Sequence, residues 1–486
     1  MSDQEKNSIP GMLNIKTKEE QVGEVSESKK EQQFYLQANK LEEIKKELFK
    51  KLSEIDPAQL IDSNSRQEIF VDFSNKITEM FPEIALFTAE GQKASEFSPK
   101  PVEIEHKKTV ASLYYLLLLT SNDAPIQNKD DVRFKILVPT FFQSKLNPQV
   151  LEEQRKVVNI LLGDKNKMCM MASMLAIHDM AKLESVLNVI NSIRSEDEQG
   201  YTSDHDVALQ SLLNNDQKMS EIMPTMAALP KEKQELIKLI LKAGSEINIG
   251  QIGQALEGNP SQIEAISKVE LSAEDIGFWF IENLADTASA AGTVDGSALV
   301  MSQESVWNAW KWAVDSLMKV KKEGVNSIEA YLNLLNHEAN ALNIDFDRKD
   351  NEQITSLRIC MALQTTDESL YQKVLSFIQD KPNTIIDLFG MEGMTGEQTY
   401  RLYYSPSILR KVSQILSPEI AMSFLNKITS TCKNKINSGE TLQNGEITFQ
   451  LSSIDAAINP KMPADKLTTL LDKNLTIDDN LYVKFL

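Results

Sequence analysis

The sequence predicts an all-α fold, and three observations support this. Apolar residues recur at helical spacing along most of the chain, several of these segments stop at glycine, and only one short stretch has the pattern of strands. With 486 residues, 42% of them hydrophobic and 25% charged, the composition is that of a globular protein of two or three domains. We therefore expect a central helical bundle with helical regions before and after it.

The N-terminal part divides into a polar segment and a helical region. Residues 1–30 are rich in Glu, Lys, Gln and Ser, which predicts a disordered segment or a frayed helix. Residues 31–98 are predicted to be helical, because FYLQANKLEEIKKELFKKLSEID places apolar residues on one helical face. The two prolines of SPKPVE then end this region.

The main domain is expected at residues 99–345 and a C-terminal helical domain at residues 346–486. The first contains amphipathic segments such as VLEEQRKVVNILLG, KQELIKLILKAG and ESVWNAWKWAVDSLMKV. The second contains a predicted loop, FGMEGMTGEQT, and a predicted short strand pair around ETLQNGEITFQLS.

Charge and composition exclude several classes of partner. The net charge is −19 without a dense Lys/Arg cluster, so we expect no direct nucleic-acid binding and no attraction to an anionic membrane surface. The longest apolar run, ASLYYLLLL, is too short to span a membrane. Three widely spaced cysteines and the absence of a signal peptide favour a reducing, cytoplasmic location.

Histidines are few: the chain has only His106, His178, His205 and His337. His178 and Asp179 are adjacent in the apolar stretch MLAIHDMAKLE, with Lys182 one turn later. A buried charged pair costs several kcal/mol unless it has partners, so either core hydrogen bonds satisfy this pair or it binds a metal ion. His205 is also followed by an acid, Asp206, in TSDHDVALQ.

Two more segments complete the candidate site. His106 begins the apolar helix EHKKTVASLYYLLLL, and Asp286 lies in the apolar, alanine-rich helix FWFIENLADTASAAG. Neutral imidazoles and carboxylates are ligands that suit a divalent cation. The fourth histidine, His337, stands between Asn336 and Glu338 and is interpreted as a partly exposed structural residue.

This series resembles the HD-domain superfamily of metal-dependent phosphohydrolases, in which a His, a His-Asp pair and a distant Asp lie on helices of one bundle. HDMAK is similar to the family's His-Asp-x-x-Lys stretch, and ENLADTASAAG is similar to its last ligand helix. The resemblance covers roughly residues 100 to 345 and implies an HD-domain-like bundle. It implies that one divalent metal ion (Mn, Fe, Zn, Ni or Mg) is bound by His106, His178, Asp179 and Asp286.

The resemblance also implies roles for the other residues. His205 would be the general acid or base, with Asp206 or Asp204 beside its ring, and Lys182 would meet a phosphate oxygen. The substrate would be a nucleotide or another small phosphate ester. The extra histidines of the family's two-metal members are mostly missing, which favours one metal. The gap from His106 to His178 is longer than usual in the family.

Other interpretations stay open. Taken singly, His106 can be a surface residue of a helix start, His205 a loop residue and Lys182 a solvated one. The whole chain can be a catalytically inactive HD-like scaffold or interaction protein, with the C-terminal helical domain as a surface for a protein partner. A third alternative, an oxygenase of the same fold, needs two irons and more ligands than the sequence offers.

Overall fold

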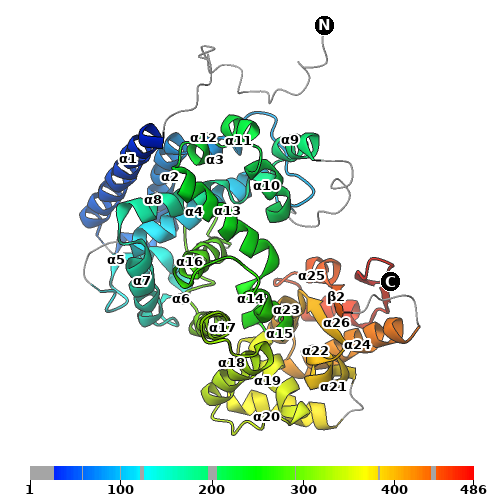
Figure 1. Cartoon of the computed structure of the whole chain (residues 1–486). Coiled ribbons are helices and arrows are strands. Elements are labelled where there is room, and N and C mark those ends of the chain that lie inside the picture. Colours follow the sequence, from blue (N-terminus) through cyan, green and yellow to red (C-terminus); the bar gives the residue numbers. More distant parts are fainter. Residues whose placement is uncertain are drawn as a thin grey trace. The chain divides into compact units, whose positions relative to one another are not determined.

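The computed structural model describes residues 27–56, 58–98, 100–120, 125–194, 205–290, 292–380, 384–438 and 445–486. Helices account for most of these residues, which confirms the all-α prediction (Figure 1). The strands of the described part are short: β1 (Gln398–Tyr403), β2 (Gly445–Gln450), β3 (Leu475–Ile477) and β4 (Val483–Phe485). No helix among these residues has the length and apolar character that a membrane span requires.

The chain divides into two units, and each is made of two separate stretches. The first unit contains residues 1–246 and 270–304, and the second contains residues 247–269 and 305–486. The boundary expected between residues 345 and 346 therefore falls inside the second unit, and the one expected at residue 98 falls inside the first. In the second unit, Tyr331 and Arg358 both bond the backbone of residues 247–269, which joins residues on either side of the expected boundary at 345.

The regular secondary structure among the described residues of the first unit is helical, apart from a single isolated bridge between Ala94 and Leu183. Its helices are α1 (Glu27–Glu54), η3 (Gln59–Ile61), α2 (Ser63–Met80), α3 (Pro82–Leu86), α4 (Val102–Leu119), α5 (Val132–Leu137), α6 (Thr140–Gln143), α7 (Pro148–Leu162), α8 (Lys165–Ile177), η4 (Met180–Lys182), α9 (Glu184–Ile193), α10 (His205–Leu213), α11 (Asp216–Ile222), α12 (Pro224–Ala227), α13 (Lys231–Glu246) and α16 (Ala273–Ser289).

Two of these helices form the centre of the first unit. α4 is buried around nearly its whole circumference, as expected for a helix that is apolar on all sides. It packs against α16, α7 and α8, and α16 also contacts α13. α16 begins at a capping box, in which Ser272 and Asp275 bond each other's backbone N–H groups.

Helix α1 confirms the periodicity seen in the sequence. Its buried face consists of Phe34, Ala38, Leu41, Ile44, Leu48 and Leu52. It packs on α8 and α2, so the amphipathic stripe finds its partner inside the first unit. Of the segment 1–30 that was expected to be disordered, residues 1–26 lie outside the described residues. Residues 27–30 belong to α1.

The second unit combines helices with small sheets. Its helices are α14 (Ile249–Gly253), α15 (Pro260–Ala265), α17 (Glu304–Glu323), α18 (Ser327–Ala341), α19 (Asn351–Leu363), α20 (Glu368–Gln379), α21 (Thr384–Phe389), α22 (Met391–Thr395), α23 (Ser405–Ile415), α24 (Pro418–Asn437), α25 (Ser452–Ala457) and α26 (Ala464–Asp472).

Two local predictions concern this unit, and one of them needs correction. The first half of the expected strand pair, residues 440–444, lies outside the described residues, and the second half forms β2, which pairs in parallel with the distant β1. The expected loop FGMEGMTGEQT contains the short helix α22 and leads into β1. The partner of β1 lies far away in the sequence, and local patterns do not reveal such a pairing.

Candidate metal centre

The end of helix α8 explains how His178 and Asp179 can act together. From Met168 onward α8 is fully buried and nearly all apolar, and it ends at Ile177. His178 is the C-cap residue, and Asp179 has left the helix with φ −94° and ψ 5°. Adjacent helical side chains point about 100° apart, so ending the helix here allows both side chains to face one side. The sequence had placed this pair within the helix.

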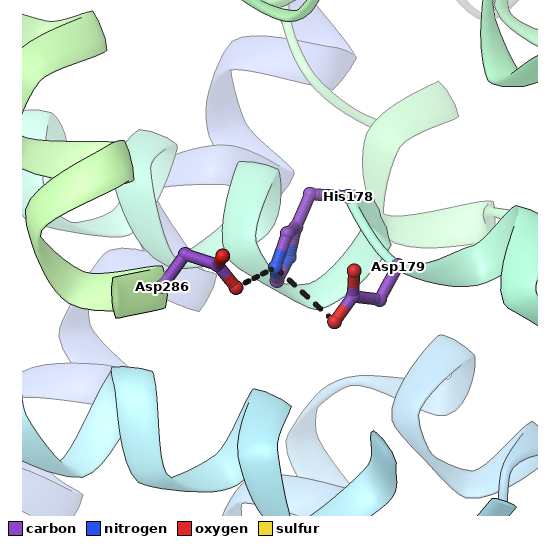
Figure 2. A group of neighbouring side chains, drawn as sticks. All are labelled: His178, Asp179 and Asp286. Atoms are coloured by element: carbon purple, nitrogen blue, oxygen red, sulfur yellow. Dashed lines mark hydrogen bonds and ion pairs between the residues drawn. The ribbon is translucent and has the colours of Figure 1, made fainter. Parts of the chain in front are cut away.

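Asp286 comes to this pair from α16. The Nε2 atom of His178 lies 2.9 Å from Asp286 Oδ1 and 3.4 Å from Asp179 Oδ2. Figure 2 shows the imidazole ring between the two carboxylates. One ligand atom from each of the three residues lies within 4.8 Å of the others, so together they could hold a metal ion.

The hydrogen bond of the other ring nitrogen determines which atom of His178 faces the carboxylates. His178 Nδ1 lies 2.7 Å from the backbone carbonyl oxygen of Leu175. A carbonyl oxygen only accepts, so Nδ1 carries the hydrogen and donates it. In the neutral ring Nε2 then has a free lone pair, which is the arrangement that metal-binding histidines commonly show.

Two lysines contact the same carboxylates. Lys108 of α4 places Nζ 2.6 Å from Asp286 Oδ1 and 3.4 Å from Asp179 Oδ2. Lys182 at the end of η4 forms an ion pair with Asp179 Oδ1 and lies 3.6 Å from Glu105 Oε2. Glu105 is also bonded by the Ser98 hydroxyl at 2.6 Å. The buried charges therefore have the partners that low polarity requires.

The charges shift the pKa values of the group in consistent directions. Burial alone would lower the pKa of His178, but Asp179 and Asp286 outweigh it and raise the pKa to about 9. Burial opposes ionisation of Asp179 and Asp286, yet the neighbouring cations lower both pKa values. Burial likewise disfavours the Lys108 ammonium, and the two carboxylates raise its pKa well above the ordinary value.

Without a metal these charges balance within the cluster. Asp179, Asp286 and Glu105 are the carboxylates, and Lys108, Lys182 and protonated His178 are the cations. Adding a divalent cation to a balanced buried cluster leaves uncompensated positive charge unless other cations leave. Binding of such an ion therefore requires a rearrangement of the existing cations.

His106, which the resemblance implied as a fourth ligand, is not one of the three residues whose ligand atoms converge. It is buried in α4, but its Nε2 faces the hydroxyl of Thr78 in α2 at 3.3 Å. Burial and the neighbouring Lys107 lower its pKa, so the ring is neutral near pH 7. The residue of α4 that reaches Asp179 and Asp286 is Lys108, two positions further on.

His205 lies at the edge of the cluster. It begins α10, and its Nε2 is 3.4 Å from Asp179 Oδ1 and 3.4 Å from Asp206 Oδ1. Asp206, one of the two acids expected beside the His205 ring, therefore approaches the same nitrogen that faces Asp179. Asp204 lies outside the described residues. His337 is on α18 in the second unit, stacked on Trp312 at 5.7 Å, and has no part in this cluster.

The sequence interpretation missed three charged residues of this region: Lys108, Glu105 and Glu282. Glu282 stands one turn before Asp286 on α16, and burial raises its pKa to about 8. Its carboxyl group accepts a hydrogen bond from Asn283 at 2.8 Å. Lys108 and Glu282 could have been found as charged residues inside apolar helices. Glu282 lies four residues before Asp286, and residues at this spacing are neighbours on a helix.

The donor set fits a divalent cation. One imidazole nitrogen and two carboxylates face each other. The Asp286 side chain is 32% exposed, so one edge of the group is open to solvent. Mixed nitrogen and oxygen ligands of this kind suit Mn, Fe, Zn or Mg. The ammonium of Lys108 is the group that such a cation must displace.

Comparison with known proteins places the chain in a family. Residues 134–454 match the model of a family of unknown function, DUF6829. The chain belongs to the DUF6829 family. No curated protein and no solved structure matches it.

The DUF6829 match includes most of the cluster. The matched residues 134–454 contain five residues of the cluster: His178, Asp179, Lys182, His205 and Asp286. Helix α4, with His106 and Lys108, precedes the start of the match. The match also crosses both units, so the DUF6829 region is larger than the part that carries the cluster.

Proposed function

We propose that the protein is a metal-dependent phosphohydrolase of the HD-domain type, acting on a nucleotide or another small phosphate ester. The observation that carries this proposal is the convergence of His178, Asp179 and Asp286, which come from segments more than a hundred residues apart. The orientation of the His178 ring, with Nδ1–H bonded to a carbonyl, supports it further.

The chain's own residues provide the other requirements of phosphate hydrolysis. Lys182 and Lys108 supply positive charge beside the cluster, which is suited to phosphate oxygens. His205 lies close enough to Asp179 to exchange a proton with a water or a leaving group bound there. A divalent ion held by the three ligands would supply polarisation of the phosphate and a more acidic bound water.

A second candidate function is a helical scaffold whose HD-like site is inactive. The position of Lys108 favours it, because an ammonium 2.6 Å from Asp286 already neutralises the carboxylates without a metal. In that case the cluster is a buried ion-pair network that stabilises the contact of α4 with α16.

Metal binding combined with phosphate release tests the first proposal. The purified protein is titrated with Mn²⁺ and then assayed against a panel of nucleoside mono- and triphosphates and simple phosphate esters. We expect one bound ion per chain and phosphate release from at least one compound. Asp179→Ala and His178→Ala should lose both, because each removes a ligand.

A matched histidine variant controls for unspecific damage. His337→Ala changes a histidine of the second unit and should keep metal and activity. Wild-type protein that takes up no divalent ion contradicts the metal centre and supports the scaffold. Protein that binds the ion but releases no phosphate from any compound contradicts the phosphohydrolase.

A further inference from the structure

Lys108 occupies an unusual position in the candidate metal centre. Its side chain is 10% exposed, and Nζ contacts Asp286 Oδ1 and Asp179 Oδ2. These are the same two oxygen atoms that His178 Nε2 approaches, at 2.9 and 3.4 Å. The ammonium therefore uses the oxygen lone pairs that a cation bound by the three ligands would need.

An ammonium and a divalent ion cannot both stay on these atoms. Two positive charges a few ångströms apart in a buried site repel each other strongly, because little water screens them. The side chain of lysine is a flexible four-carbon stem and can move its charge without moving the helix. Its neighbour Asp286 is the most exposed of the three ligands, with 32% of its side chain accessible. A displaced ammonium thus has a route to the open edge of the cluster.

We propose that Lys108 exchanges partners during the reaction cycle: its ammonium holds Asp179 and Asp286 in the metal-free protein, a divalent ion displaces it, and the freed ammonium binds a phosphate group of the substrate. This inference rests on the proposed metal-dependent function. It explains why a lysine is buried between two carboxylates of a site suited to a metal, and it makes metal binding a competition between two cations.

A graded series of variants tests the exchange through Mn²⁺ affinity measured by calorimetry. Lys108→Met removes the competitor, so we expect Mn²⁺ to bind roughly tenfold tighter or more, within the usual range of coupling between two ligands. Lys108→Arg keeps the charge and can bind a carboxylate through two hydrogen bonds, so Mn²⁺ should bind more weakly than in wild type. Lys107→Met, at the exposed neighbouring position of α4, is the matched control and should leave the affinity unchanged.

Inorganic phosphate tests the destination of the ammonium. With Mn²⁺ bound, phosphate should bind wild type and Lys107→Met equally, and Lys108→Met at least several-fold more weakly. Equal phosphate binding by Lys108→Met and wild type overturns this role. Should Lys108→Met fail to fold without metal, the comparison of Lys108→Arg with wild type still decides the competition.

The outcomes separate this inference from the proposed function. If wild type binds Mn²⁺ and Lys108→Met binds it no more tightly, the exchange is wrong while the metal centre stands. If only Lys108→Met binds Mn²⁺, the competition is supported and the wild-type protein is the scaffold. If neither the wild type nor any Lys108 variant binds a divalent ion, both proposals fail.

Discussion

The buried charges around His178 show how single residues determine what this protein can bind. His178 is 4% exposed and Asp179 1% exposed, so neither can obtain much stabilisation from water. Each instead relies on specific partners, Leu175 and Asp286 for the ring and the two lysines for Asp179. Removing one partner leaves another charge uncompensated, and variants here therefore report on the whole group.

His205 provides a prediction at the same scale. His205→Ala should keep the bound metal and reduce phosphate release by about 10²–10⁴-fold, the usual contribution of general acid–base catalysis. The reason is that His205 contacts Asp179 from the edge of the cluster, at 3.4 Å, and is not one of the three converging ligands. Metal content by elemental analysis and phosphate release are measured on the same sample.

Asp179→Ala is the comparison for His205→Ala. It should lose metal and activity together, because its carboxylate contacts every cation of the cluster. Loss of metal from His205→Ala would mean that His205 is a ligand. Unchanged turnover in His205→Ala would mean that another group moves the proton.

At the scale of a single element, helix α18 carries a buried acid without a cation. Glu338 is 5% exposed, and burial raises its pKa to about 8 from the ordinary 4.5. The neutral carboxyl group is therefore favoured in the folded protein. Because the folded pKa lies above the unfolded one, this contribution to stability is complete below pH 4.5 and is lost as the pH rises to about 8.

Glu338→Gln should remove this pH dependence. The amide has no proton to release, so the free energy of unfolding of the variant relative to wild type should increase between pH 5 and pH 8. The increase is at most about 1.4 kcal/mol per pH unit. Denaturant unfolding at a series of pH values measures this difference in the free energy of unfolding. If the difference between Glu338→Gln and wild type stays constant from pH 5 to pH 8, the buried Glu338 is not the origin of the pH dependence.

A surface acid serves as the control for Glu338. Glu323→Gln changes an exposed residue in the last turn of α17 and should follow the wild-type pH profile. Comparing the slopes, and not the absolute stabilities, is essential, since a buried amide can also lose or gain hydrogen bonds at every pH.

At the scale of the whole molecule, a buried arginine explains why the second unit is discontinuous. Arg358 of α19 is fully buried and donates to the carbonyl oxygens of Ala255, Gly258 and Phe389 at 2.8 to 3.1 Å. Tyr331 of α18 donates to two of the same oxygens. Ala255 has φ 54°, a left-handed conformation that costs energy in a non-glycine residue. These bonds attach residues 247–269 to the segment from residue 305 onward.

Arg358→Met should destabilise the second unit by about 3 kcal/mol or more, because carbonyl groups in its interior lose their donors. Native-state hydrogen exchange should show lower protection in α14 and α15 together with α19. The control Arg348→Met removes a surface pair with Glu329, and its cost should be within about 1 kcal/mol. Lost protection confined to α19 would contradict the attachment of residues 247–269 through Arg358.

The helices of the fold could largely be predicted from the sequence alone. Helical periodicity, prolines and caps are local signals, so the sequence predicted α1 together with the residues of its buried face. The same signals identified α4, α8 and α16 as apolar helices. The His-Asp pair and Asp286 stood out for the same reason, as charges inside apolar helices. Their convergence was an expectation from family resemblance, since 107 positions separate Asp179 from Asp286.

Only the tertiary structure decided which residue of α4 faces the carboxylates. Positions 106 and 108 lie about 200° apart around a helix. An amphipathic pattern would have selected one of them, but α4 is buried on nearly all sides and both residues lie in its apolar surroundings. The packing of α4 against α16 and α8 sets the rotation that turns Lys108 toward Asp179 and Asp286, and His106 toward Thr78. The pairing of β1 with β2, and the division into two units, depend in the same way on contacts between distant segments, which no local pattern in the chain encodes.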